Sequence, residues 1–258
     1  MTIDDFAGLP GVGFVSGGTG GIGAEVCRTL AARGSDVAFT YGRSHDRAAA
    51  LVEEIEGAGR RAAAWSVDLL DEDGVVAAIG EIVERFGGIH SFVHAAGPHV
   101  PQIHLSKVSP SQFRESLDQE AAGFFTLVHT VLPHLRAAAG SIVAVTSAAP
   151  RRFPVRDGLS SVPKASVEGL VRAIAVEEGR FGIRANSVGP GMLTDGMAER
   201  LISSGDLGPD ALDAAMRNIP LRKFGRATDI AEAVCFLASS RAGFISGQAL
   251  DVDGGFSA

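Results

Sequence analysis

Short apolar runs alternate with longer helix-like segments along nearly the whole chain, and this alternation limits the folds open to it. Most of the runs are almost continuously apolar, which is typical of strands buried on both faces of a sheet. We predict strands at Val12–Ser16, Asp36–Tyr41, Arg61–Val67, Ile89–His94, Gly140–Thr146, Ile183–Val188 and Gln248–Val252. We predict helices at Gly21–Ala32, Asp46–Ala58, Glu72–Phe86, Pro110–Ala139, Ser161–Arg180 and Thr228–Ala238. This order predicts an α/β protein with a doubly wound parallel sheet of seven strands and helices on both faces.

One segment, residues 192–226, interrupts the alternation between the sixth and seventh predicted strands. It has the pattern of one or two short helices joined by loop. Ligands of doubly wound sheets bind outside the carboxyl ends of the strands, so an insert at this place is expected to be a lid over the substrate. No repeat, low-complexity tract or linker divides the 258 residues. We therefore expect one domain, spanning residues 1–258.

A glycine-rich turn, Ser16–Gly23, follows the first predicted strand and opens the first predicted helix. Such a turn must bend tightly, let backbone approach a pyrophosphate and pack a helix close to the sheet, and glycine meets each need because it has no Cβ. The helix that follows presents free N–H groups and the positive end of its dipole to the anion. The alternative is a purely structural turn. The position of the turn in an alternating chain favours nucleotide binding and a Rossmann-type fold.

Composition excludes several other classes of protein. A formal net charge of −7 argues against a nucleic-acid partner, because phosphate binding needs clustered Lys and Arg. No apolar run approaches the roughly 20 residues of a membrane-spanning helix, so no membrane partner is expected. The first residues, Met1–Ala7, carry two aspartates and no basic segment, which is unlike a secretory signal. We expect a cytoplasmic protein without a metal site, whose two cysteines, Cys27 and Cys235, are buried free thiols.

A set of motifs that runs almost the length of the chain resembles the short-chain dehydrogenase/reductase family, and especially its 3-oxoacyl-carrier-protein reductase branch. The glycine turn looks like the family's T-G-x-x-x-G-x-G, with Ser16 in the threonine place. The later motifs follow in the family's order. They are Asp68-Leu69, Val93–Gly97, Asn186–Gly191, Ile219–Leu221, Phe224-Gly225, Gly247-Gln248 and Val252–Gly255.

The resemblance implies a nicotinamide cofactor. We expect it to be held by Ser16, Gly17, Gly21, Ile22, Gly23, Tyr41, Arg43, Ser44, Asp68, Leu69, Ala95, Ala96, Gly97, Lys164, Pro190, Gly191, Leu193 and Thr194. NAD-binding proteins usually carry an acidic residue at the end of the second strand, and Tyr41 stands there instead. Arg43 and Ser44 could bind a 2′-phosphate, which favours NADP(H) and leaves NAD(H) as the alternative. Gly20 weakens this preference, because NADP-preferring relatives often have arginine at that place.

The catalytic positions depart from the family pattern. The resemblance assigns Ser147 to the substrate-binding serine and Lys164 to the lysine that holds the ribose. Counting thirteen residues forward from Ser147, or four back from Lys164, leads to Ser160 at the place of the catalytic tyrosine. An alkyl hydroxyl is a far weaker acid than a phenol, whose pKa is about 10, and it is shorter by a ring. The only tyrosine of the chain is Tyr41, so no tyrosine elsewhere can take the role.

Several groups could replace the missing phenol. Glu120 falls at the family's catalytic asparagine and is expected to lie buried beside Lys164, either as part of the chemistry or as a structural ion pair. Asp157 falls where enoyl-carrier-protein reductases place their tyrosine, and it could instead cap the helix that follows. His99 lies just after the nicotinamide-side loop, whereas a structural role is favoured for His94. A water held by Ser160 and Lys164 is a further candidate donor.

These departures leave more than one function open. The first is an NADP(H)-dependent oxidoreductase that reduces a carbonyl or a conjugated C=C of a small molecule or an acyl thioester. The second is a catalytically inactive nucleotide-binding protein that acts as a sensor or partner subunit, and the third is a lyase or isomerase. Arg151, Arg152 and Arg156 could receive an anionic substrate or be ordinary loop charges. The resemblance also implies a homodimer or homotetramer formed through the helices that begin near Pro110 and Ser161.

Overall fold

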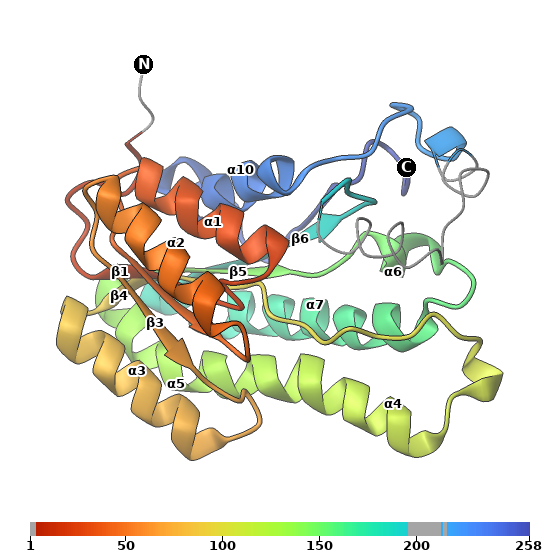
Figure 1. Cartoon of the computed structure of the whole chain (residues 1–258), viewed down its shortest axis with the longest axis horizontal. Helices are drawn as coiled ribbons and strands as arrows, with labels where there is room; N and C mark the ends of the chain where they lie inside the picture. The colour runs from red at the N-terminus through yellow and green to blue at the C-terminus, as the bar shows by residue number, and fades with distance from the viewer. Residues whose placement is uncertain (1–3, 196–212, 214–215) are drawn as a thin grey trace.

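A seven-stranded parallel sheet forms the centre of the molecule (Figure 1). The computed structural model describes residues 4–195, 213 and 216–258. The strands are β1 (Val12–Ser16), β2 (Val37–Tyr41), β3 (Ala62–Ser66), β4 (Ile89–His94), β5 (Ser141–Val145), β6 (Arg184–Pro190) and β7 (Ala249–Val252). They lie in the order β3-β2-β1-β4-β5-β6-β7, and every neighbouring pair is parallel. The predicted doubly wound Rossmann-type α/β fold is confirmed.

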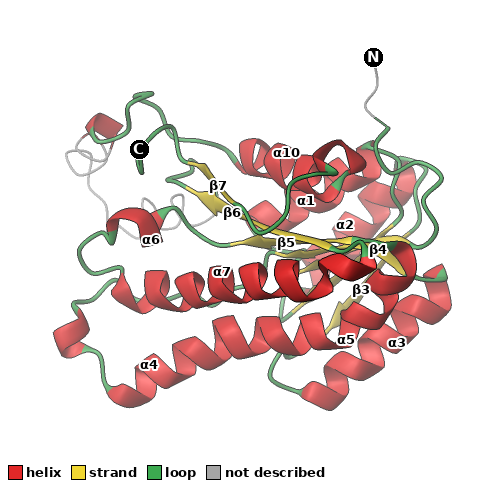
Figure 2. Cartoon of the chain, turned by 180° about the vertical axis from the view of Figure 1, so that it is seen from behind, coloured by secondary structure: helices red, strands yellow, loops and turns green. Residues whose placement is uncertain are grey.

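Two layers of helices cover the sheet (Figures 1 and 2). One layer contains α1 (Gly21–Ala32), α2 (His45–Gly57) and α10 (Ala227–Ala238). The other contains α3 (Glu72–Phe86), α4 (Pro110–Leu117), α5 (Gly123–Ala138) and α7 (Gly158–Glu178). Side chains of the sheet alternate between the two layers: Val15 and Phe39 belong to the first core, and Phe14 and Ala38 to the second. Burial on both faces explains why apolar residues dominate these runs, and most of their polar side chains are themselves buried.

The prediction of one continuous helix over Pro110–Ala139 is wrong in one detail. A π-helical turn, Asp118–Ala122, joins α4 to α5. Short π-helical turns inside α-helices occur often at functional sites, and apolar periodicity gives little sign of them. This one contains Glu120 at its centre.

Helix α7 begins at Gly158, three residues before the predicted start. Pro163 lies inside it and has no N–H to donate to the Leu159 carbonyl. The hydroxyl of Ser116 on α4 donates to that carbonyl instead, at 2.8 Å. This bond ties α4 to α7 beside Ser160.

The segment between β5 and α7 is more regular than expected. It contains a short helix, α6 (Ala149–Arg152), where the sequence suggested only loop. Short 3₁₀ turns also occur at Leu105–Lys107, Gly179–Phe181 and Ser240–Ala242.

The proposed lid falls largely on residues 196–212 and 214–215, which lie outside the described part of the chain. At its start, Leu193 forms a bridge with Gly225 near its end. No helix among the described residues combines the length and the apolar character needed to cross a bilayer. Cys27 and Cys235 are buried free thiols, as predicted.

Candidate active site

The glycine turn lies where the strand order reverses, between β1 and β4, which is the place where doubly wound sheets bind nucleotides. Gly17 has φ +76°, and a Cβ there would lie 2.6 Å from Ala96 Cα in the loop after β4. A Cβ on Gly23 would overlap the Gly17 carbonyl oxygen. Gly20 is the N-cap residue of α1 and has no side chain that could accept from the first amides of the helix. These amides therefore remain available to an anion. The turn therefore fits a dinucleotide pyrophosphate.

Ser16 and His94, the last residues of β1 and β4, contact each other beneath this turn. The Ser16 Oγ and His94 Nδ1 lie 2.8 Å apart, and both side chains are buried. The His94 Nε2 has no hydrogen-bond partner. Burial, with a further contribution from the charge of Lys164, lowers the pKa of His94 to about 3. His94 is therefore neutral and braces the sheet, which matches the structural role favoured for it.

A pocket of about 360 Å³ lies at the start of α2 and is lined by Arg43, Ser44, His45, Asp46 and Arg47. Arg47 was not among the predicted cofactor residues, although its position one turn after Arg43 is readable from the sequence. The Tyr41 hydroxyl lies 2.7 Å from His45 Nδ1, so the tyrosine side chain points to α2. Two guanidinium groups at a helix N-terminus suit a phosphate.

The remaining predicted cofactor residues follow the carboxyl ends of other strands. The Asp68 carboxylate accepts a hydrogen bond from the Leu70 amide at 3.0 Å, which fixes its orientation after β3. At the end of β6, the Gly191 amide donates to Val252 at 3.0 Å. The Thr194 amide donates to Gly225 at 2.9 Å, and Leu193 is buried.

An ion pair with a buried carboxylate joins α7 to the π-helical turn. Lys164 Nζ on α7 donates to Glu120 Oε1 in the π-helical turn. Glu120 is only 3% exposed and Lys164 is 17% exposed, so the carboxylate is buried while the ammonium keeps some access to solvent. A Cβ on Gly97 would lie 3.1 Å from Glu120 Oε1 and 3.7 Å from Lys164 Nζ. The pair therefore lies directly against the loop expected to carry the nicotinamide, and the predicted closeness of Glu120 and Lys164 is confirmed.

Ser147 and Ser160 stand on either side of the segment between β5 and α7. The Ser147 Oγ accepts a hydrogen bond from the Ala149 amide at 3.1 Å, which leaves its O–H available to a substrate. Ser160 is half-buried, and its hydroxyl makes no hydrogen bond among the described residues. It lies one helical turn before Lys164, on the same face of α7.

The other candidate proton donors differ in their surroundings. Asp157 precedes α7, but its carboxylate caps no amide, so the capping interpretation is wrong for the side chain. That carboxylate accepts from Gln102 Nε2 at 3.5 Å. Burial raises the pKa of Asp157, and Lys164 partly opposes the rise. His99 is exposed in the loop after β4, and no described hydrogen bond joins it to the catalytic positions.

Two of the three loop arginines are used by the protein itself. Arg151 makes two hydrogen bonds to the buried Glu168 and one to Asp251. Arg152 donates to the Phe256 carbonyl at 2.7 Å. The bonds to Asp251 and Phe256 hold the C-terminal segment against α6. Among the three arginines, only Arg156 has no described partner.

Comparisons with known proteins agree with this geometry. Residues 17–257 match the profile of a family described as Enoyl-(Acyl carrier protein) reductase. The 3-oxoacyl-[acyl-carrier-protein] reductase of Staphylococcus epidermidis is 34% identical over 242 residues, which cover 93% of this chain and 96% of the relative. The chain belongs to the short-chain dehydrogenase/reductase family. It is an NAD(P)-dependent oxidoreductase, as the reductases and dehydrogenases among its relatives indicate.

Solved short-chain dehydrogenase/reductase structures share the fold over almost the whole chain. A blue fluorescent protein from a metagenomic library, in complex with NADPH, has a TM-score of 0.88 and 31% identity, and covers 98% of this chain and 100% of its own. A short-chain dehydrogenase of Burkholderia cenocepacia in complex with NADP has a TM-score of 0.87 and 32% identity. The match covers 97% of this chain and 99% of that one. A nicotinamide cofactor is therefore part of this chain's function.

Proposed function

We propose that this protein is an NADP(H)-dependent reductase that protonates its product through a water held by Ser160 and Lys164. Its substrate is a carbonyl compound or a conjugated C=C, with acyl thioesters included. The observation that carries the proposal is the buried Lys164–Glu120 pair next to Ser160 and Gly97. It keeps an ammonium group at the place where the family needs a proton source, although the tyrosine is absent.

Each side chain has a role that its hydrogen bonds allow. The Ser147 hydroxyl, which already accepts from Ala149, donates to the substrate oxygen. Lys164 has three N–H donors and uses one on Glu120, so the others can bind the ribose and a water. Ser160 orients that water, and bound NADPH supplies the hydride. Protonation passes from the water to the substrate, and Lys164 restores the proton to the water.

The preference for NADP(H) rests on the pocket at the start of α2. Arg43 and Arg47 line it together with Ser44. Bidentate guanidinium groups bind phosphate strongly, whereas an unphosphorylated ribose gains little from them. Relatives solved with NADPH and with NADP support the same choice.

We also propose that the whole chain acts as one domain and assembles into homodimers or homotetramers. Phe125 on α5 is 53% exposed and Val176 on α7 is 83% exposed, and both helices lie on the same face of the sheet (Figure 2). Exposed large apolar side chains favour a partner surface. Sedimentation velocity on wild type and Phe125→Glu/Val176→Glu tests this, because a shift of the variant toward the monomer is expected.

NADPH oxidation by wild type and Ser160→Tyr, on ketones, 3-oxoacyl thioesters and enoyl thioesters, tests the catalytic proposal. Wild type is expected to turn over at least one class. Glu120→Gln removes the carboxylate that holds Lys164 in place and should slow turnover by roughly 10²-fold, the lower range for disturbing a positioned proton donor. Turnover unchanged in Glu120→Gln but lost in Asp157→Asn or His99→Ala would move the donor to that residue. Activity confined to Ser160→Tyr would contradict catalysis by wild type and support a binding role.

A further inference from the structure

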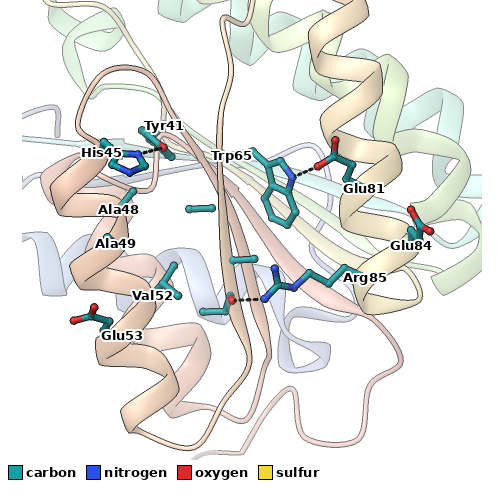
Figure 3. Close-up of a pocket in the computed structure, with 13 residues that line it drawn as sticks. Tyr41, His45, Ala48, Ala49, Val52, Glu53, Trp65, Glu81, Glu84 and Arg85 are labelled. Carbon is teal, nitrogen blue, oxygen red and sulfur yellow. Dashed lines mark hydrogen bonds between the residues drawn. The ribbon is translucent and has the colours of Figure 1, made fainter.

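A groove of about 700 Å³ lies on the edge of the sheet, along β3 (Figure 3). Its floor is the edge strand, with the small side chains of Ala62, Ala63 and Ala64. Helix α2 forms one wall and helix α3 the other. The space between the two helices stays open above the strand, because the alanine side chains of the floor are too small to fill it.

The floor presents backbone groups that no neighbouring strand pairs among the described residues. β3 is the terminal strand of the sheet and pairs only with β2 among the described strands. The Val37 amide donates to Arg61 O and the Val67 amide to Tyr41 O, so odd-numbered residues of β3 face β2. Ala62, Ala64 and Ser66 therefore turn their N–H and C=O groups outward, and of these Ala64 and Ser66 are open to solvent whereas Ala62 is buried. Such an edge is a template for a further strand.

The two walls differ in chemistry, as Figure 3 shows. The wall on α2 offers small apolar side chains, Ala48, Ala49 and Val52, with Glu53 at its rim. The wall on α3 offers two exposed carboxylates, Glu81 and Glu84, and Arg85. Arg85 donates to the Ala62 carbonyl at 3.4 Å, so its charge lies over the strand. Glu53, Glu81 and Glu84 form no ion pair among the described residues, so the groove carries excess negative charge.

The negative charge of the groove indicates which kind of segment can bind there. A second copy of the chain would bring its own Glu53, Glu81 and Glu84 against this set, and like charges repel. An anionic partner is repelled for the same reason. Side chains of an added strand alternate between the two walls, because successive residues of a strand point to opposite faces. The best match is a strand with cationic residues toward α3 and small apolar residues toward α2.

We propose that this groove, lined by α2, β3 and α3, binds an extended segment of a partner protein in which Lys or Arg alternates with small apolar residues. The segment adds to β3 as an eighth strand. Its backbone bonds to the outward groups of Ala64 and Ser66, and its cationic side chains face Glu81 and Glu84. This role does not use Ser147, Ser160 or Lys164, and the groove meets the pocket at the start of α2 at His45, which lines both.

The chain contains a single tryptophan, Trp65, and it lines the groove. Its Nε1 donates to Glu81 Oε2 at 2.7 Å, so an occupant that engages Glu81 must disturb the indole. The probe is a capped, fluorescently labelled hexapeptide of alternating Lys and Val, added to the full-length protein. Anisotropy reports binding, and the emission of Trp65, with unlabelled peptide, reports its place.

We expect the Lys-Val peptide to bind and to shift Trp65 emission, whereas a Glu-Val peptide does not bind. Glu81→Gln/Glu84→Gln should weaken binding roughly fivefold at low salt, since exposed ion pairs are individually weak. Glu72→Gln/Glu177→Gln removes two exposed carboxylates outside the groove and is the matched control, with unchanged affinity.

Ala64→Pro removes one outward N–H while no ladder bond to β2 is lost, because proline is tolerated at outward-facing edge positions. It should weaken binding about tenfold. Thermal unfolding of this variant checks that it folds, and Ala64→Val, which keeps the N–H, should bind nearly as wild type. Absence of binding at millimolar peptide would overturn the proposal. So would binding without a change in Trp65 emission, or equal binding of a helical lysine-rich peptide.

Discussion

The part of the proposed site between β1 and β4 is built mainly from backbone, whereas the part between β5 and α7 is built from charged side chains. In the first part, Gly17 and Gly23 allow contacts that any Cβ would block. In the second, the Lys164–Glu120 pair occupies the centre of the site, beside a serine in place of a tyrosine. A backbone-built site tolerates little change without losing its shape. A side-chain-built site can change its chemistry while the fold is kept.

The largest expected effect comes from breaking the ion pair. Lys164→Met leaves the Glu120 carboxylate buried without a partner and should lower the free energy of unfolding by about 3 kcal/mol. Lys164→Met/Glu120→Gln should recover most of that loss, because the uncompensated charge is gone. Urea denaturation of the three proteins measures both. A double variant no more stable than the single one would mean that the pair is not the source of the effect.

A Cβ in the glycine turn should act on the part between β1 and β4. Gly23→Ala places a methyl group against the Gly17 carbonyl, and overpacking of this kind costs about 1–3 kcal/mol. We expect NADPH affinity to fall at least roughly tenfold, which isothermal titration calorimetry would show. Gly57→Ala, at the end of α2 with open space around the added methyl, is the control. Equal effects of the two substitutions would contradict a close-packed turn.

The positive charge at the start of α2 should make the affinity for NADPH higher than the affinity for NADH. Arg43→Ala is expected to weaken NADPH binding roughly tenfold and to leave NADH binding nearly unchanged, because only NADPH carries the 2′-phosphate. Arg47→Ala should act in the same direction. If NADH affinity fell equally in either variant, the arginine would hold a part common to both cofactors.

The smallest effect concerns pH. Asp157 has a pKa raised by burial, so the native state binds its proton more tightly than the unfolded state does. Its unfavourable contribution to stability is absent below the unfolded pKa, near 3.9, and grows as pH rises through the higher native pKa. The melting temperature of Asp157→Asn, relative to wild type, should therefore increase from acidic to neutral pH. A difference that is constant with pH would contradict the raised pKa.

The sequence predicted the sheet, its seven strands and the close-packed glycine turn at the switch point, because apolar alternation and glycine spacing are local signals. It also predicted that Glu120 and Lys164 meet, since motif positions fixed their places in the fold. It could not predict the π-helical turn or α6, which depend on packing rather than on periodicity. The bonds of Arg151 to Glu168 and Asp251 join residues up to 100 positions apart, and no pattern of spacing announces them.

The edge groove escaped the sequence analysis for a similar reason. Ala62, Ala63 and Ala64 look like an ordinary buried strand, and the carboxylates of α2 and α3 look like solvated helix faces. Only the strand order, with β3 outermost, reveals that these residues share one surface.

The π-helical turn at Asp118–Ala122 has a consequence for substitutions at its centre. A turn of this kind contains one residue more than an α-helical turn, so it behaves as an insertion that the helix has absorbed. The flanking helices keep their packing, with Ser116 bonded to α7 on one side and Phe124 buried against the sheet on the other. Glu120, at the centre, is thereby released from the helical repeat. A substitution at position 120 therefore changes the group that meets Lys164 while the packing of both flanking helices is kept.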